Sequence, residues 1–282
     1  MNALEIRGLG KRYKDFTLDD INLTLPSGCI MGLVGENGAG KTTTIKLIMN
    51  AVKSDKGQVK VLGCDSKSPE FDSVKEDIGI VLDEAYFPEI LTAKNVNGIM
   101  KSTYRRWDEK RYFDYLKRFS LPQNKSFKDF SRGMKMKLAI AVALSHNPKL
   151  LILDEATSGL DPIVRDEILD IFNEFTRDES HSILISSHIV SDLEKLCDYI
   201  AFIHKGKLIF FKEKDALLEE YGMVCMPKAG FEAVPSEAVV GKRISDYGVE
   251  ALVRRRAVSS AIRVEKTSVE NIILFLVKGD KK

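Results

Sequence analysis

Gly35-Glu36-Asn37-Gly38-Ala39-Gly40-Lys41-Thr42-Thr43 is the stretch that decides the fold. It matches the pattern G-x-x-x-x-G-K-[ST] of phosphate-binding loops. An apolar run of strand length precedes it, residues 29–34, and apolar residues at near-helical spacing follow it, residues 43–52. Glycines let the backbone curl so that successive N–H groups face an anion, and a helix N-terminus adds free donors and a positive dipole end. The motif therefore predicts a phosphate-binding turn between a buried strand and a helix.

Two side chains of this stretch have the chemistry to hold a nucleotide. Lys41 can reach the β- and γ-phosphates, and the hydroxyl of Thr42 can ligate Mg²⁺. An accidental match in a chain of 282 residues is expected on the order of one time in a hundred. Because strand, loop and helix signals also follow in the order that the motif requires, we predict a nucleotide site here.

The composition is that of a globular protein with a substantial core. Of the 282 residues 44% are hydrophobic, which suffices for one large domain or two smaller ones. Lys and Arg number 43 and Asp and Glu 41, and the net charge of +2 argues neither for nor against nucleic acid. The four cysteines are far apart and are predicted to be buried, reduced thiols. With no signal segment and no apolar run of about 18 residues, we expect a protein that is soluble by itself and able to dock on a membrane protein.

The N-terminal part is predicted to be rich in strands. Residues 4–9 and 16–25 form two of them, because apolar residues in the second run roughly alternate with polar ones. Residues 58–62 and 78–82 are predicted strands as well. Tyr13 lies in the charged loop between the first two strands. Taken alone, it is more simply a half-buried loop residue; stacking on a base, worth roughly 1–3 kcal/mol, is the alternative.

A helical block then interrupts the alternation of strands and helices. Residues 92–120 have a helical pattern with many charges, and Ser131 is a good N-cap for a further amphipathic helix. We therefore predict a helical subdomain, about residues 85–145, inserted in an α/β core. The turn before it carries two exposed-looking aromatic residues, Tyr86 and Phe87.

Two carboxylates and a histidine follow apolar runs that are typical of central parallel strands. Residues 150–154 end in Asp154, with Glu155 next, and residues 182–186 lead into His188. The carboxyl ends of such strands are where α/β sheets bind ligands, so Asp154 is the predicted Mg²⁺ partner of the loop and Glu155 a candidate general base. A lone histidine is more often structural, and the position of His188 leaves a structural and a functional role both open.

The rest of the chain is predicted to hold a hairpin and a small separate domain. Pro162, at the end of the turn 158–162, is placed to start a helix, and strands 199–203 and 207–211 flank the turn Lys205-Gly206. In the small α+β domain, strands are predicted at 249–253 and 262–264 and a final helix from about Ser268. The predicted domains are residues 1–221 and 222–282.

These motifs, from Tyr13 through His188, resemble in order and spacing those of the ATP-binding subunit of ABC transporters. Residues 35–42 look like the Walker A loop and 150–154 like Walker B, with Glu155 in the catalytic glutamate position. Residues 158–161 match the D-loop, which ends in Asp161, and His188 matches the switch histidine. Tyr13 falls where the family has its adenine-stacking aromatic residue, and the resemblance therefore favours that role.

Residues 130–134, Phe-Ser-Arg-Gly-Met, occupy the place of the family's signature L-S-G-G-Q. Arg132 replaces the first glycine and Met134 the glutamine, while Ser131 and Gly133, which hold the partner's γ-phosphate in the family, remain. An S-x-G-M form is similar to that of ABC-2 type exporters of bacterial drugs and peptides. A second departure is Asp83, where the family usually has the Q-loop glutamine. It is a candidate metal ligand, directly or through a water, and alternatively a negative charge that weakens hydrolysis.

The resemblance implies an α/β phosphate-loop NTPase core with an N-terminal antiparallel β subdomain, an inserted helical subdomain and a small C-terminal α+β domain. It implies an ATPase that uses ATP and Mg²⁺, with Lys41, Glu155 and His188 catalytic. Two chains, identical or not, would pair head to tail and dock on transmembrane permease subunits at the cytoplasmic side of the membrane. A soluble ABC-type ATPase acting on nucleic acid or ribosomes and an importer ATPase are the alternatives. The first is disfavoured because one cassette, no long heptad run and balanced charge predict no nucleic-acid partner.

Overall fold

The computed structural model describes residues 1–83 and 87–279. The chain divides into two compact units, one made of Met1–Ile189 with Ala201–Phe211 and the other of Val190–Ile200 with the chain from Lys212 onwards. All of the residues predicted for the nucleotide site belong to the first unit. The predicted domain boundary after residue 221 falls inside the second unit and stays a prediction.

Within the described ranges, ten strands form one sheet in the order β5-β4-β1-β2-β10-β9-β3-β8-β7-β6. Neighbours among β5, β4, β1 and β2 are antiparallel, whereas β3, β8, β7 and β6 are parallel. This arrangement confirms an α/β core with an N-terminal antiparallel β subdomain. The strands are β1 (Asn2–Arg12), β2 (Thr17–Pro26), β3 (Ile30–Val34), β4 (Lys56–Val61), β5 (Cys64–Asp65), β6 (Ile78–Val81), β7 (Leu150–Asp154), β8 (Ser182–Ser187), β9 (Tyr199–His204) and β10 (Lys207–Glu213).

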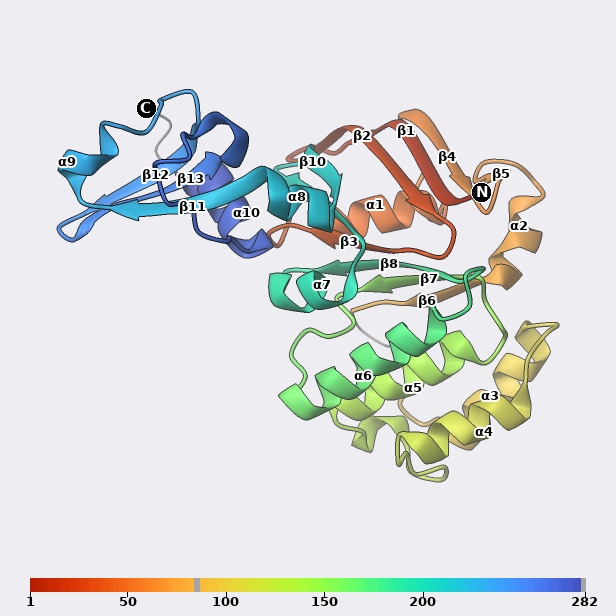
Figure 1. The fold of residues 1–282 in the computed structure, drawn as a ribbon. Helices are drawn as coiled ribbons and strands as arrows, with labels where there is room; N and C mark the ends of the chain where they lie inside the picture. The colour runs from red at the N-terminus through yellow and green to blue at the C-terminus, as the bar shows by residue number, and fades with distance from the viewer. Residues whose placement is uncertain (84–86, 280–282) are drawn as a thin grey trace. The chain divides into compact units, whose positions relative to one another are not determined.

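The first helix, α1 (Lys41–Ile48), packs against both β4 and β7, so it lies between the antiparallel and the parallel parts of the sheet (Figure 1). All residues of β3, β7 and β8 are buried, as expected for parallel strands covered on both faces. The helix pattern was predicted to reach residue 52. It ends earlier because Asn50 takes a left-handed φ of 52° and the N–H of Ala51 bonds back to the carbonyl of Lys46 at 2.9 Å.

The inserted block is helical, as predicted, and its helices begin at side-chain caps. Thr92, Asp108 and Ser131 each accept a hydrogen bond from a backbone N–H three residues on. α4 packs on α5, and α5 packs on β6. The helices and 3₁₀ turns outside α1 in this unit are α2 (Phe71–Val74), η1 (Lys75–Asp77), α3 (Ala93–Thr103), α4 (Glu109–Arg118), η2 (Phe127–Asp129), α5 (Arg132–Leu144) and α6 (Pro162–Phe175).

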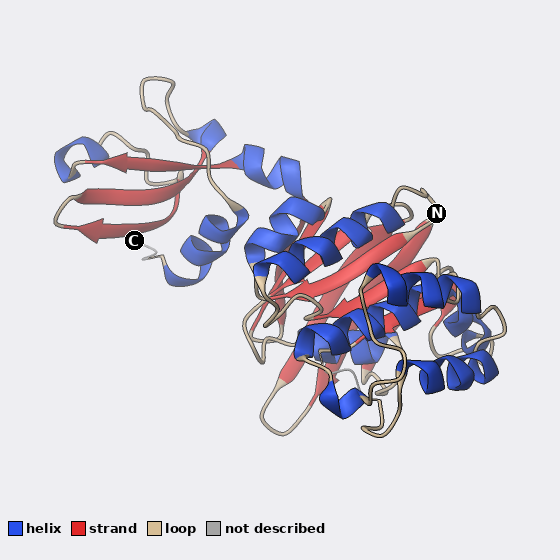
Figure 2. Ribbon diagram, turned by 90° about the horizontal axis from the view of Figure 1, so that it is seen from below, coloured by secondary structure: helices blue, strands red, loops and turns tan. Residues whose placement is uncertain are grey.

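The second unit is α+β, as the sequence predicts. Its antiparallel sheet has the order β11-β13-β12, and α10 packs on β12 and β13 (Figure 2). Val224, Val234, Ala251 and Val253 form its buried cluster. Its elements are α7 (Val190–Leu196), α8 (Lys214–Glu220), β11 (Tyr221–Met226), α9 (Lys228–Phe231), β12 (Val239–Ser245), β13 (Gly248–Arg254), η3 (Arg255–Ala257) and α10 (Val269–Lys278).

One strand of this unit was predicted wrongly. Residues 262–264 are not a strand. Glu265, just after them, forms an isolated bridge to Met223 of β11, and the guanidinium of Arg255 donates to the carbonyls of Val264 and Glu265 at 3.3 and 2.7 Å. β11 and β12 complete the sheet, and only short apolar runs mark them in the sequence.

The cysteine prediction is correct only in part. All four thiols are free, but Cys197 alone is buried, and Cys225 is exposed. Over the described residues, the helices are all too short or too polar to span a bilayer.

Candidate nucleotide-binding site

The predicted loop is a left-handed curl that leads straight into α1. Gly38 and Gly40 have φ values of +79° and +117°, which residues with a side chain rarely adopt. A Cβ added at Gly38 would meet nothing within 4 Å, so the loop leaves open space at this point. Gly40 is the N-cap of α1 and no side chain caps it, so the N–H groups of the first turn are not taken up by a cap. This is the backbone geometry that binds phosphate.

Lys41 is almost fully buried and links the loop to the end of β7. Its Nζ donates to the carbonyl of Gly35 at 2.7 Å and lies 3.0 Å from Oε1 of Glu155. The side chain of Lys41 is 6% exposed and that of Glu155 11%, so solvent screens this ion pair little. The two predicted catalytic groups are therefore in direct contact.

Thr42 and Asp154, the two predicted Mg²⁺ ligands, are in direct contact. Oγ1 of Thr42 donates to Oδ2 of Asp154 at 2.7 Å, and Oγ of Ser186 donates to the other carboxylate oxygen. In the described part of the chain, no cluster of three or more His, Cys, Asp or Glu side chains is placed to hold a metal. A hydroxyl and one carboxylate fit Mg²⁺, which is usually held by one or two protein groups together with waters and phosphate oxygens.

Glu155 has a constrained backbone. Its φ of 53° is left-handed, and its N–H donates to the carbonyl of Ser186 at 3.0 Å. A glutamate in this region carries strain that the surrounding structure must hold in place. Oε2 of Glu155 lies 2.8 Å from Nδ1 of His188, so the histidine predicted at the end of β8 touches the predicted base.

Ser131, Gly133 and Asp161 form a second cluster around the starts of α5 and α6. Oγ of Ser131 accepts from the N–H of Met134 at 3.2 Å, and Oδ1 of Asp161 accepts from the N–H of Val164 at 3.0 Å. A Cβ added at Gly133 would lie 3.7 Å from Val164, so the two helix starts are neighbours. Their contact with a nucleotide on a second chain stays a prediction.

The remaining predicted residues, Tyr13 and Asp83, both have exposed side chains. Tyr13 is 42% exposed, and Nζ of Lys11 lies 5.9 Å from its ring centroid. Oδ1 of Asp83 is 3.1 Å from a guanidinium nitrogen of Arg132, an ion pair that the sequence did not predict. Asp83 and Arg132 both depart from the family pattern, and these two departures are the sequence signal that could have suggested the ion pair. The roles of Tyr13 in stacking and of Asp83 at the metal stay predictions.

Two further residues, Ser186 and Gly206, support the predicted site, and the sequence motifs do not include them. Ser186 bonds to Asp154 and offers its carbonyl to the N–H of Glu155, so one residue of β8 positions both carboxylates. Gly206 donates its N–H to the carbonyl of Ala39 at 3.0 Å. Neither belongs to a recognisable motif, because a serine within a strand and a glycine in a hairpin are common.

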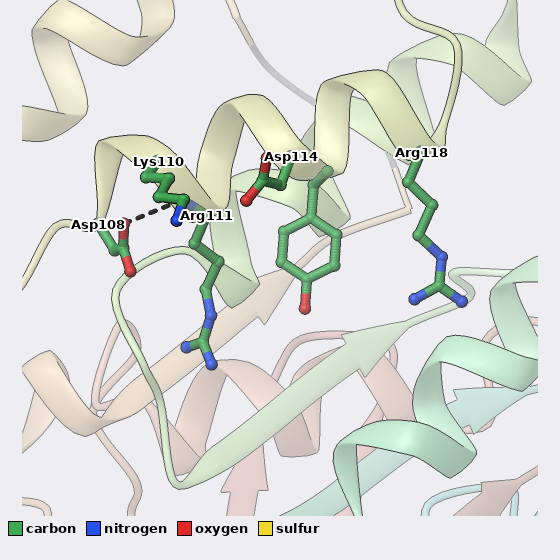
Figure 3. A pocket seen from close by; sticks show the side chains of 6 residues that line it. Asp108, Lys110, Arg111, Asp114 and Arg118 are labelled. Carbon is green, nitrogen blue, oxygen red and sulfur yellow. Dashed lines mark hydrogen bonds between the residues drawn. The ribbon is translucent and has the colours of Figure 1, made fainter.

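A hollow of about 380 Å³ lies along α4 (Figure 3), and none of the predicted site residues lines it. Asp108 accepts there from the backbone N–H of Arg111 at 2.9 Å, and Arg118 donates twice to Glu174, at 2.6 and 2.9 Å. Neighbouring groups thus fix these charges, and the hollow is not part of the nucleotide site. Its lining is Asp108, Lys110, Arg111, Asp114, Tyr115 and Arg118.

Comparison with known proteins agrees with this geometry. The family model described as ABC transporter matches residues 18–158. The chain is 37% identical to the lantibiotic transport ATP-binding protein SrtF of Streptococcus pyogenes, over 75% of this chain and 91% of that protein. It is 35% identical to the bacitracin transport ATP-binding protein BcrA of Enterococcus faecalis, over 73% of this chain and 68% of that protein.

A solved structure is similar as well. The ATP-binding subunit of an ABC transporter superposes with a TM-score of 0.69 at 28% identity, covering 76% of this chain and 91% of that one. Fold, motif geometry and sequence similarity thus agree on ATP binding and on hydrolysis coupled to transport. The chain belongs to the ABC transporter family, as one of its ATP-binding, ATP-hydrolysing proteins.

Proposed function

We propose that this chain drives export of peptides, drugs or other small amphiphiles as the ATPase of an ABC-2 type transporter. The observation that carries the ATPase part is the contact of Lys41, Glu155 and His188 beside the Thr42–Asp154 pair. The direction and cargo are supported by the S-x-G-M signature and by relatives named for lantibiotic and bacitracin transport.

In the proposed mechanism, each side chain has one task. Lys41 and the N-terminus of α1 neutralise the phosphates, and Tyr13 stacks on the adenine. Glu155 takes a proton from the attacking water, and His188, in contact with Oε2 of Glu155, holds that carboxylate in line. Mg²⁺, held by Thr42 and Asp154, would add positive charge beside the β- and γ-phosphates.

We further propose that the cluster of Ser131, Gly133 and Asp161 serves the nucleotide bound to a second chain. ATP-binding proteins of this family dimerise and work with transmembrane permease components. The exposed backbone at the start of α5 would then face a γ-phosphate as a helix N-terminus does. On this proposal the protein acts at the cytoplasmic side of the membrane, bound to its permease.

The experiment is size-exclusion chromatography of Glu155→Gln with and without Mg-ATP, beside the ATPase activity of the wild type. We expect a shift from monomer to dimer with ATP and hydrolysis by the wild type. A wild type that neither binds nor hydrolyses ATP would contradict the ATPase assignment. Hydrolysis with a Glu155→Gln protein that stays monomeric at saturating ATP would contradict pairing of identical chains.

The permease contact is proposed to lie at the turn after β6. Phe87 packs edge-on against Phe127 with ring centroids 5.5 Å apart, whereas Tyr86 lies outside the described residues. Replacing both aromatic residues with serine should abolish co-purification with the permease while ATP binding persists. Retained co-purification would contradict this surface, and co-purification with ribosomes or RNA instead would favour a soluble ABC-type ATPase.

A further inference from the structure

The two departures from the ABC pattern contact each other. Nη2 of Arg132, at the start of α5, lies 3.1 Å from Oδ1 of Asp83, in the turn after β6. The two side chains are 54% and 52% exposed, so solvent weakens the ion pair without removing its geometric effect. A glycine at position 132 and a glutamine at position 83, as in the family pattern, cannot form this pair.

Arg132 also touches the turn that precedes α6. A Cβ added at Gly159 would lie 2.7 Å from Nη1 and 2.9 Å from Cζ of Arg132, so the guanidinium occupies the place of a side chain at that position. Gly159 has a φ of +67°, which independently favours glycine. The planar guanidinium therefore rests on the peptide backbone at Gly159 while it pairs with Asp83.

The turn under Arg132 is the one that Glu155 begins. The N–H of Ser158 donates to the carbonyl of Glu155 at 3.0 Å, and Asp161 caps the helix that follows. Gly159 directly follows Ser158 in the chain. A movement of Gly159 therefore pulls on the hydrogen-bonded turn that begins at Glu155, the predicted base. Arg132 connects this turn to the start of α5 and to the end of β6.

We propose that Arg132 is a positioning residue, which pairs with Asp83 and rests on Gly159 so that the turn carrying Glu155 is held in place. The inference rests on the proposed function, because it assigns Arg132 to the site at which ATP would be hydrolysed. It makes Asp83 and Arg132 a matched pair whose effects belong to one interaction. Arginine suits this place because its planar fork pairs with a carboxylate and stacks on a flat group at the same time.

The test is a double-mutant cycle with Arg132→Ala, Asp83→Ala and the double variant. We expect each single substitution to lower kcat about two- to fivefold, the range that a half-exposed ion pair supports. The double variant should lose no more than either single one, because the interaction is already broken. Arg132→Lys should recover part of the loss, since an ammonium also pairs with Asp83.

Two measurements separate positioning from folding and from nucleotide binding. Amide hydrogen exchange of the nucleotide-free protein should rise in residues 155–161 of Arg132→Ala and Asp83→Ala and stay unchanged in β7 and α1. The affinity of Arg132→Ala for a fluorescent ATP analogue should stay at the wild-type value, because Lys41 and Thr42 are untouched. Lys128→Ala, which removes an exposed lysine four residues before Arg132, is the matched charge control and should behave as the wild type in each measurement.

Gly159→Ala provides a variant that leaves both charges in place. The added methyl group should displace the guanidinium and reproduce the kinetic loss of Arg132→Ala. Alanine is strained at a φ of +67° with or without Arg132, so the same methyl group has a cost of its own, and the loss should be smaller in the Arg132→Ala background than in the wild type.

The outcomes are distinct. Losses that multiply in the double variant, a wild-type kcat in Arg132→Ala, or unchanged exchange in residues 155–161 would each overturn the inference. Failure of the wild type itself to bind and hydrolyse ATP would instead contradict the proposed function.

Discussion

At the scale of single residues, Glu155 is held from three directions. Lys41 and His188 contact its two carboxylate oxygens, and Ser186 accepts its N–H. These contacts orient the carboxylate before substrate arrives. A general base that is already oriented loses less conformational entropy when the reaction occurs. Its left-handed φ of 53° is the strain that this arrangement tolerates.

Glu155→Gln should slow ATP hydrolysis by about 10²–10⁴ fold, the usual contribution of general-base catalysis, because the amide cannot accept the proton of water. ATP binding should persist. Steady-state phosphate release and binding of a fluorescent ATP analogue measure the two effects. Glu174→Gln, remote on α6, is the control, and near-normal turnover in Glu155→Gln would refute the role.

His146 should make the folded protein sensitive to acid. It is fully buried between its hydrogen bond to the carbonyl of Ile78, at 3.1 Å, and the ring of Tyr104, with ring centroids 4.0 Å apart. Burial lowers the pKa of His146 below its ordinary value. The unfolded chain therefore binds the proton more readily, and stability falls as the pH drops below about 6.5.

The measurement is the melting temperature of the wild type and of His146→Gln between about pH 5 and pH 8, the window in which histidines titrate. The wild type should lose more stability on acidification than the variant. All other histidines are common to both proteins, so equal pH dependence would contradict the assignment.

At the scale of elements, most of the strands and helices of the first unit follow from the sequence. The largely apolar runs of β7 and β8, the cap Ser131 and the helix start at Pro162 are local signals, and the structure confirms them. The contacts that complete the site are not local. Ser186 reaches Asp154 across neighbouring strands, and Arg132 reaches Asp83 across 49 positions of the chain, so no spacing rule predicts them.

The small second unit was predicted less well, for a related reason. β11 and β12 pair with β13, whereas the chain after β13 contributes an isolated bridge from Glu265 to Met223 of β11. Short strands such as these are stabilised by packing against neighbours more than by their own composition. Pattern alone therefore predicts β13 and the last helix but neither β11 nor β12.

Gly206→Ala should damage the hairpin of β9 and β10 and, through it, the phosphate loop. A Cβ at Gly206 would lie 1.9 Å from the carbonyl oxygen of Thr17, and φ there is +76°. We expect a loss of more than about 2 kcal/mol, from left-handed strain together with the overlap, and weaker ATP binding because Gly206 supports Ala39.

Chemical denaturation and nucleotide titration measure the two effects of Gly206→Ala. Gly98→Ala is the matched control, since a Cβ at this position in α3 meets nothing within 4 Å. It should be neutral or stabilising by up to about 1 kcal/mol. Equal stability of the two variants would contradict the steric argument.

At the scale of the whole molecule, the chain divides into two compact units, and the second has a buried cluster of its own. Val253→Ala removes two buried methyl groups from the cluster of the second unit and should cost about 1–3 kcal/mol. ATP affinity should not change, because the nucleotide residues all belong to the first unit.

Urea denaturation and ATP titration test this separation. Ile244→Ala, at a position 56% exposed in the same unit, is the control and should change stability by less than about 0.5 kcal/mol. A loss of ATP affinity in Val253→Ala would show that the units are energetically coupled.

The contact between Lys41 and Glu155 has a consequence for ligand choice. The ammonium of Lys41, which is predicted to bind phosphate, already has an anionic partner at 3.0 Å, and little solvent reaches the pair. Glu155 therefore acts as an internal competitor, and an incoming anion must displace it. A singly placed weak anion gains too little to do so, whereas a triphosphate gains from the loop and the helix end together. The Lys41–Glu155 ion pair should therefore favour ligands with several negative charges. Binding of such a ligand to Lys41 would also free the carboxylate of Glu155, the predicted base.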